Sequence, residues 1–236
     1  MEQVQAKVNG VHLLNNNVYQ VDLSVADVNF IAGQYLMICL PTGEKVPYSI
    51  GSAPHQLPHI TLYILVTDET SLAATVIRTL NHNEEVTLMI PGGDANIANG
   101  ALDKQPEQVL LLAGGTGFAQ MKSIFEHLDH SGYAGKVCLY WGLRSQEDVF
   151  LQDWLATEHR FDLQVVLNEG AEGWSGRTGW LYEAVLADHP DLSRSVAFIS
   201  GSVGMVYGTL DHLEAAGLAT ENAYSDVFAY APRPAK

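Results

Sequence analysis

The chain has 236 residues, 47% of them hydrophobic and 17% charged, which is enough apolar material for the cores of two modest domains and argues against long disordered stretches. Its 27 acidic and 12 basic residues give a formal net charge of −15 at pH 7. Because such a charge repels nucleic acids and anionic membrane surfaces, we expect neither as a partner.

The cysteines and the apolar runs bear on the cellular compartment in which the protein is expected. Cys39 and Cys138 are far apart, each within an apolar run, so the spacing predicts buried reduced thiols and no disulfide framework. The N-terminus lacks the basic and then apolar pattern of a signal peptide, and no apolar run approaches the roughly 20 residues of a membrane helix. These features predict a cytoplasmic protein.

Residues 1–98 are predicted to form an antiparallel β-barrel. Apolar residues recur at every second position, as at Val21 and Leu23 and again at Ile60 and Leu62, and turn-forming residues separate the segments. One helix is expected near residues 71–80, with Thr70 as its cap. Gly, Asn, Asp and Pro are frequent over residues 91–108, which reads as a connector.

Residues 99–236 are predicted to form an α/β domain, because short apolar runs there alternate with longer amphipathic stretches. This alternation indicates an open, mostly parallel sheet with helices between its strands. The expected strands are 109–113, 137–141, 163–167, 196–200 and 224–230, and the expected helices lie near 118–130, 149–159, 182–188 and 205–216. His127 and His130 share a face of one expected helix but lack a further ligand, so we expect them to face solvent and predict no metal.

Four residues, Gly114 to Gly117, form a glycine turn between the first of these strands and the helix-like stretch that follows. A strand, a glycine turn and a helix N-terminus together make a site for nucleotide phosphates, because unpaired N–H groups meet the positive end of the helix dipole. The spacing is not G-x-G-x-x-G, and an ordinary tight turn fits it equally well.

Ordered motifs along the whole chain decide between these interpretations. The chain carries A-G-Q-Y-L-M, K-V-P-Y-S, G-G-T-G-F, Y-W-G-L-R, G-W-S-G-R-T-G and Y-S-D-V-F-A-Y, which start at residues 32, 45, 114, 140, 173 and 224. With a β-barrel before a nucleotide-binding sheet, this series resembles the ferredoxin-reductase superfamily, and within it the bacterial NAD(P)H:flavin oxidoreductases, including the reductases of luminous bacteria. The resemblance implies a flavin-binding barrel at 1–98 and an NAD(P)-binding domain at 99–236.

The resemblance also implies site residues for the flavin. Ser49 would orient the flavin beside N5 as the catalytic residue, with no general base, since the cofactor carries the chemistry. Tyr35 would lie near the flavin or simply fill the core. The other implied flavin contacts are Pro47, Tyr48, Ile50 and Tyr63, with Phe228 approaching the ring from the final strand.

For NADH or NADPH, the resemblance implies a cradle at the glycine turn, with Phe118 completing its motif. Arg144 would meet a phosphate or a ribose, and Ser200 and Gly201 would follow the next inner strand. Nothing in these positions separates NADH from NADPH.

Two departures from the family pattern bear on how flavin is held. Many members have an arginine for the flavin phosphate two residues before the Tyr or Phe of P-Y/F-S, where this chain has Val46, and Asp68 stands where a phosphate-clasping glycine turn is expected. We therefore expect free FMN, riboflavin or FAD as a substrate that leaves reduced, with a flavin-dependent monooxygenase or luciferase as candidate recipient. The alternatives are a reductase with bound FAD that serves a ferredoxin or an oxygenase, and a non-catalytic nucleotide or flavin sensor.

Overall fold

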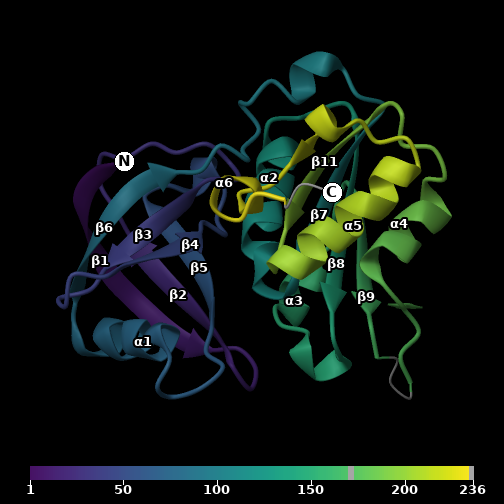
Figure 1. Ribbon diagram of the computed structural model, residues 1–236. Helices are drawn as coiled ribbons and strands as arrows, with labels where there is room; N and C mark the ends of the chain where they lie inside the picture. The colour runs from purple at the N-terminus through teal and green to yellow at the C-terminus, as the bar shows by residue number, and fades with distance from the viewer. Residues whose placement is uncertain (170–172, 234–236) are drawn as a thin grey trace.

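Two six-stranded sheets lie side by side in the computed structural model, which describes residues 1–169 and 173–233 (Figure 1). The N-terminal sheet is entirely antiparallel, in the order β4-β3-β6-β1-β2-β5. Its strands are β1 Glu2–Leu13, β2 Val18–Ser24, β3 Tyr35–Cys39, β4 Lys45–Ser49, β5 His59–Leu65 and β6 Glu85–Gly92. The antiparallel pairing of these strands is the one that the period-2 pattern predicted.

The barrel core holds the inward residues of these strands together with one face of helix α1, Leu72–His82. The helix begins one residue later than expected, because Ser71 is its cap and accepts a hydrogen bond from the Ala74 N–H at 3.1 Å. The hydroxyl of Thr70 bonds to Asp68 instead.

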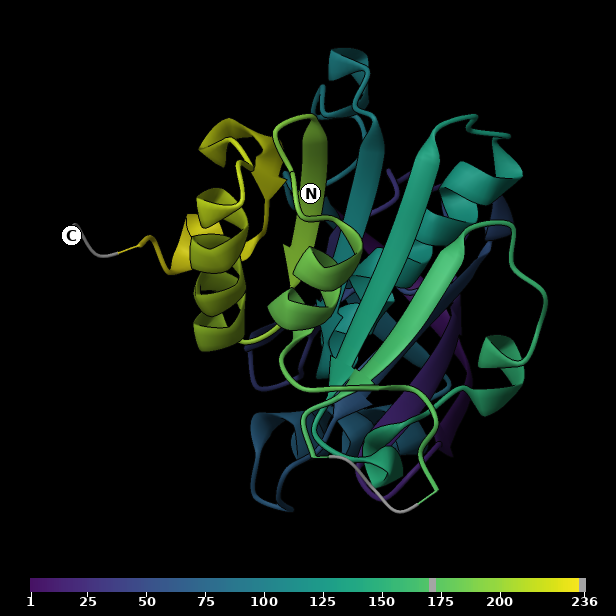
Figure 2. The same cartoon turned by 90° about the vertical axis from the view of Figure 1, so that its right-hand side faces the viewer.

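The C-terminal sheet is parallel, in the order β10-β9-β8-β7-β11-β12. Its strands are β7 Gln108–Gly114, β8 Lys136–Leu143, β9 Asp162–Leu167, β10 Arg177–Thr178, β11 Ser195–Ser200 and β12 Ala223–Tyr224. Helices flank this sheet on both sides (Figure 2). Successive residues of β7 therefore enter two different cores, with Leu111 packed beneath α2 and Leu112 beneath α5.

The helices are α2 Phe118–His130, α3 Gln152–Leu155, α4 Leu181–Asp188, α5 Val203–Ala215 and α6 Val227–Tyr230. Two expectations are corrected here, and one element is new. The helix expected at 149–159 is the short α3, the two-residue strand β10 was not foreseen, and the strand expected at 224–230 is divided into β12 and α6. The predicted domain boundary at residues 98 and 99 falls in the connector between β6 and β7 and stays a prediction.

Helix α2 holds the two sheets together. Its Gln120 side chain donates to the carbonyl of Gly33 at 2.8 Å, Lys122 donates to that of Gly51 at 3.3 Å, and Ser123 to that of Ser52 at 2.8 Å. All three side chains are buried, so these bonds are shielded from water and position the barrel against the parallel sheet.

The histidines of α2 and the two cysteines differ in part from what the sequence predicted. His130 is exposed as expected and also stacks on His55 of the barrel with ring centroids 3.8 Å apart, whereas His127 is partly buried. Cys138 is buried as predicted, whereas Cys39 is only partly buried. Within residues 1–169 and 173–233, no helix combines the length and apolar character needed to cross a bilayer.

Candidate active site

A cleft with a volume of about 1520 Å³ lies between the two sheets. A pocket for one small ligand usually measures about 300 to 1,000 Å³, so this cleft has room for the reacting parts of two ligands. Predicted site residues line it from both sides: Tyr35, Pro47, Tyr48, Ser49 and Tyr63 from the barrel, and Gly114, Gly115, Thr116, Gly117, Arg144, Ser200 and Gly201 from the parallel sheet.

The barrel side of the cleft combines a hydroxyl with aromatic rings. Ser49 is the last residue of β4 and pairs across the strands with Tyr35 of β3. Its hydroxyl is half-buried and has no hydrogen-bond partner in the described part of the chain. Burial raises the pKa of Tyr48 to about 12 and also raises the pKa of Tyr63, so both phenols are neutral near pH 7. This surface suits a flat aromatic ligand that accepts a hydrogen bond.

The glycine turn faces this surface from the end of β7. Gly115 has a φ of +54°, and a Cβ added there would meet no atom within 4 Å, so the turn borders open space. The Trp141 indole N–H holds the turn by donating to the Gly115 carbonyl at 2.9 Å. Helix α2 starts at Phe118 without a side-chain cap, directly after the turn, so the positive end of its dipole lies at the turn and favours an anionic ligand.

Gly117 has a different reason to be glycine. A Cβ there would lie 2.4 Å from the carbonyl oxygen of Ser200, so only glycine lets the turn pack against the end of β11. This close approach places Ser200 and Gly201 beside the turn, at the carboxyl ends of neighbouring strands. Ligands of parallel sheets bind at that edge.

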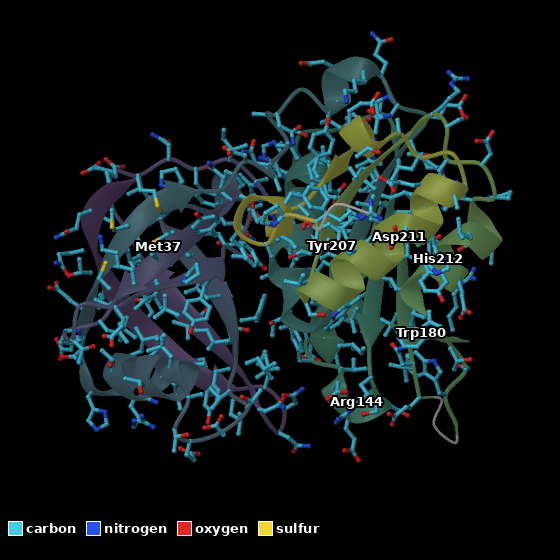
Figure 3. All side chains as sticks on the ribbon, in the orientation of Figure 1. Met37, Arg144, Trp180, Tyr207, Asp211 and His212 are labelled. Atoms are coloured by element: carbon cyan, nitrogen blue, oxygen red, sulfur yellow. The ribbon has the colours of Figure 1, made fainter. Side chains whose placement is uncertain are left out.

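Arg144 follows β8 at the same edge of the sheet (Figure 3). Its side chain is 75% exposed and lies 3.7 Å from the Asp148 carboxylate. The arginine side chain can therefore reach a ligand, although the nearby Asp148 carboxylate partly neutralises its positive charge.

Three predicted contacts lie elsewhere. Ile50 is fully buried in the barrel core, and the Phe118 ring stacks on Trp141 with centroids 4.1 Å apart beneath the turn. Phe228 lies on α6 and packs toward Tyr207, because one helical turn replaces the expected strand and rotates its side chain away from the cleft. None of these three side chains lines the cleft.

Asp226 is a cleft residue that the sequence analysis missed. Its carboxylate accepts from the Gln120 amide at 3.0 Å and from the Ala95 N–H at 3.4 Å. Burial raises its pKa, and the neighbouring Asp94 raises it further. The signal was present in Y-S-D-V-F-A-Y, where the aromatic Phe228 seemed the better candidate.

Trp180 is a second missed residue. It precedes α4, is 58% exposed, and lines both the main cleft and an adjoining cavity of about 450 Å³. Gly204 and Gly208 of α5 line this second cavity, as do Tyr182 and His212, whose rings stack at 3.7 Å. An exposed tryptophan beside glycines offers a flat face to an aromatic base.

Comparison with known proteins identifies the parallel-sheet half. Residues 111–211 match the family described as the oxidoreductase NAD-binding domain. The protein is an oxidoreductase with an NAD-binding domain over these residues. The matched region starts within β7 and contains the glycine turn and Arg144, which confirms the expected pyridine-nucleotide domain and enzyme class.

Relatives of this oxidoreductase extend the similarity over the whole chain. It is 29% identical to an NAD(P)H-flavin reductase of Aliivibrio fischeri over 238 residues, covering 96% of this chain and 99% of the relative. A protein of the same description from Vibrio harveyi is 28% identical over 242 residues, with coverage of 96% and 99%. The solved structure described as the ferredoxin reductase in carbazole 1,9a-dioxygenase superimposes with a TM-score of 0.82 at 19% identity, covering 95% of this chain and 69% of that one. The oxidoreductase therefore has the expected ferredoxin-reductase-like fold.

Proposed function

We propose that this oxidoreductase uses NAD(P)H to reduce free FMN, riboflavin or FAD by direct hydride transfer to flavin N5. The observation that carries the proposal is that Ser49 and the glycine turn at Gly114–Gly117 line one cleft. Relatives described as NAD(P)H-flavin reductases that match nearly the full chain support the same reaction.

In this proposal the nicotinamide supplies a hydride from its C4 atom and flavin N5 accepts it, which leaves NAD(P)⁺ and reduced flavin. The residues of the chain position the two rings, whose reacting atoms must approach to roughly 3 to 3.5 Å. The Ser49 hydroxyl donates a hydrogen bond near N5, where negative charge develops on reduction. The glycine turn and the positive end of the α2 dipole hold the pyrophosphate.

The charges on the barrel side support flavin as a substrate that leaves. Among the described barrel residues that line the cleft, none is a lysine or an arginine. Val46, which stands where many members of the resembled family have a phosphate-binding arginine, packs partly against the barrel core, and Lys45 is exposed. A missing charge-assisted contact weakens binding by roughly 10-fold to 150-fold. Flavin therefore dissociates after reduction, toward a recipient that we propose to be a flavin-dependent monooxygenase or luciferase.

Steady-state NAD(P)H oxidation with and without added flavin tests the reaction. Ser49→Ala should lower kcat by roughly 100-fold, the loss typical when a donor to developing charge is removed. Ser24→Ala is a matched control, because Ser24 also ends a barrel strand but lies outside the cleft. Folded protein without flavin-dependent turnover would contradict the proposal.

The same preparation separates the alternatives. Flavin that stays with the protein through gel filtration would favour a reductase with bound FAD that serves a ferredoxin or an oxygenase. Binding of flavin or nucleotide without any turnover would favour a sensor. The cytoplasmic location expected from the two cysteines stays a prediction.

A further inference from the structure

The glycine turn at the cleft has little conformational preference of its own. Three of its four residues are glycine, and Gly115 has a φ of +54° with open space where a Cβ would stand. Glycine adopts left-handed and right-handed backbone conformations about equally, and a loop that becomes ordered only on binding loses affinity. A contact that fixes the turn before the nucleotide arrives therefore strengthens binding.

Trp141 makes such a contact from the core. It lies on β8 opposite Ala113 of β7, is fully buried, and does not line the cleft. Its indole N–H donates to the Gly115 carbonyl at 2.9 Å. The same carbonyl accepts from the Phe118 N–H at the start of α2. The Gly115 carbonyl is therefore anchored by the strand below it and by the helix after it.

The indole of Trp141 is itself held by two aromatic rings. The Phe118 ring stacks on it with centroids 4.1 Å apart, and the Phe150 ring meets it edge-on at 4.7 Å. A fully buried ring packed in this way cannot turn without displacing its neighbours. The direction of its N–H is therefore set by the core and does not depend on a ligand.

The direction of the Gly115 carbonyl sets the direction of the next N–H. A trans peptide is planar, so the Gly115 carbonyl and the Thr116 N–H point in opposite directions. Because the carbonyl faces Trp141 in the core, the Thr116 N–H faces the cleft, which Thr116 lines. The positive end of the α2 dipole lies at the same place. A diphosphate at the turn thus meets a donor whose orientation is already fixed.

We infer that Trp141 is a positioning residue for the nucleotide: its indole N–H holds the Gly115–Thr116 peptide in the orientation that directs the Thr116 N–H to the diphosphate of NAD(P)H. The inference rests on the proposed function in placing the diphosphate at the glycine turn, and it holds whichever way the dinucleotide runs from there. Trp141 acts through the turn and contacts no ligand.

The first test is the binding of ADP-ribose to Trp141→Phe, measured by calorimetry without flavin. Phenylalanine keeps an aromatic ring in the core but has no N–H. We expect Kd to rise by about 2-fold to 12-fold, the factor that corresponds to one neutral hydrogen bond. KM for NADH should rise by a similar factor, while kcat at saturating NADH and KM for riboflavin stay unchanged.

Trp154→Phe is the matched control. It also removes an indole N–H, which donates to Glu126 at 2.8 Å, from a ring that packs against Phe118, but Trp154 does not line the cleft or bond to the turn. We expect its Kd for ADP-ribose to equal that of wild type. Urea denaturation should show that both variants lose stability. Wild-type affinity in folded Trp141→Phe would assign the tryptophan a purely structural role and overturn the inference, as would equal weakening in both variants.

The wild-type protein gives an independent measurement, which holds even if Trp141→Phe folds poorly. A phosphate on the Thr116 N–H polarises the peptide and makes the Gly115 carbonyl a stronger acceptor. The indole N–H resonance of Trp141 should therefore shift when ADP-ribose binds, and that of Trp154 should not. An unmoved Trp141 resonance at saturation would overturn the inference. A shift in a protein that shows no flavin-dependent turnover would count against flavin reduction and leave the role of Trp141 standing.

Discussion

The Gln120 side-chain amide donates to the Asp226 carboxylate at 3.0 Å, and the same amide donates to the carbonyls of Gly33 and Ala95 at 2.8 and 3.1 Å. One buried side chain thus joins the barrel, the connector and the C-terminal segment at the edge of the cleft. The arrangement of the cleft depends on this group of contacts.

Asp226→Asn should change how stability depends on pH. The pKa of Asp226 is raised above its ordinary value of 3.8, so the folded protein binds this proton more tightly than the unfolded chain does. The contribution to the free energy of unfolding is therefore present at low pH and is lost as pH rises from the unfolded to the folded pKa. Asparagine does not ionise.

The measurement is urea denaturation of both proteins from about pH 4 to about pH 8. The free energy of unfolding of Asp226→Asn minus that of wild type should rise with pH through this window and then level off. Taking the difference cancels the other titrating groups. A difference that stays flat or falls with pH would show that Asp226 has no raised pKa.

Gly115→Ala and Gly117→Ala should separate ligand binding from folding. Alanine at 115 meets no neighbour but must adopt a φ of +54°, which costs about 1–2 kcal/mol, and it places a methyl group in the cleft. We expect weaker NADH binding with a modest loss of stability. Alanine at 117 would stand 2.4 Å from the Ser200 carbonyl oxygen, so we expect the larger fall in free energy of unfolding. Calorimetry with ADP-ribose and urea denaturation report the two effects, and a reversed order of stabilities would contradict this assignment.

Lys122→Met should strongly destabilise the protein. Lys122 and Glu126 form an ion pair at 2.6 Å with side chains only 9% and 18% exposed, and the ammonium also lies over the Trp154 ring. Removal of the cation leaves the mostly buried Glu126 without its charged partner, and loss of one partner from a fully buried pair costs about 3–5 kcal/mol, so we expect a loss toward the lower end of that range.

The double variant Lys122→Met/Glu126→Gln removes the stranded charge and keeps an acceptor for the Trp154 N–H, which donates to Glu126 at 2.8 Å. It should unfold at higher urea concentration than the single variant. If both variants lost the same free energy, the interaction between the two charges would be negligible.

Trp180→Ala should raise KM for the nucleotide while leaving KM for flavin unchanged, because the indole lines the cleft beyond the end of β9 rather than the barrel wall. Stacking of a base on an aromatic side chain contributes about 1–3 kcal/mol, which corresponds to roughly 5-fold to 150-fold in affinity. Trp180→Phe should restore most of the loss. Equal changes in both KM values would indicate a general disturbance of the cleft.

Much of the fold followed from local patterns. The alternation at Val21 and Leu23 predicted barrel strands, and the apolar run before Gly114 predicted a buried parallel strand, because side-chain period and turn chemistry act over a few residues. The segment after Tyr224 was misassigned for the same reason. Its aromatic residues favour a strand locally, but packing of Phe228 toward Tyr207 is satisfied by one turn of helix.

The sequence by itself determined that an antiparallel sheet precedes a parallel one, and it also determined the glycine turn and the likeness to flavin reductases. Each of these depends on residues that are contiguous in the chain. Only the tertiary structure decided that Asp226, Trp180 and Glu169 line the cleft and that Ile50, Phe118 and Phe228 do not. The direction in which a side chain points at such a cleft is set by contacts between residues far apart in the chain, such as Gln120 with Asp226 and Gly117 with Ser200. Short-range periodicity does not predict these contacts, because they form only when segments far apart in the chain pack together.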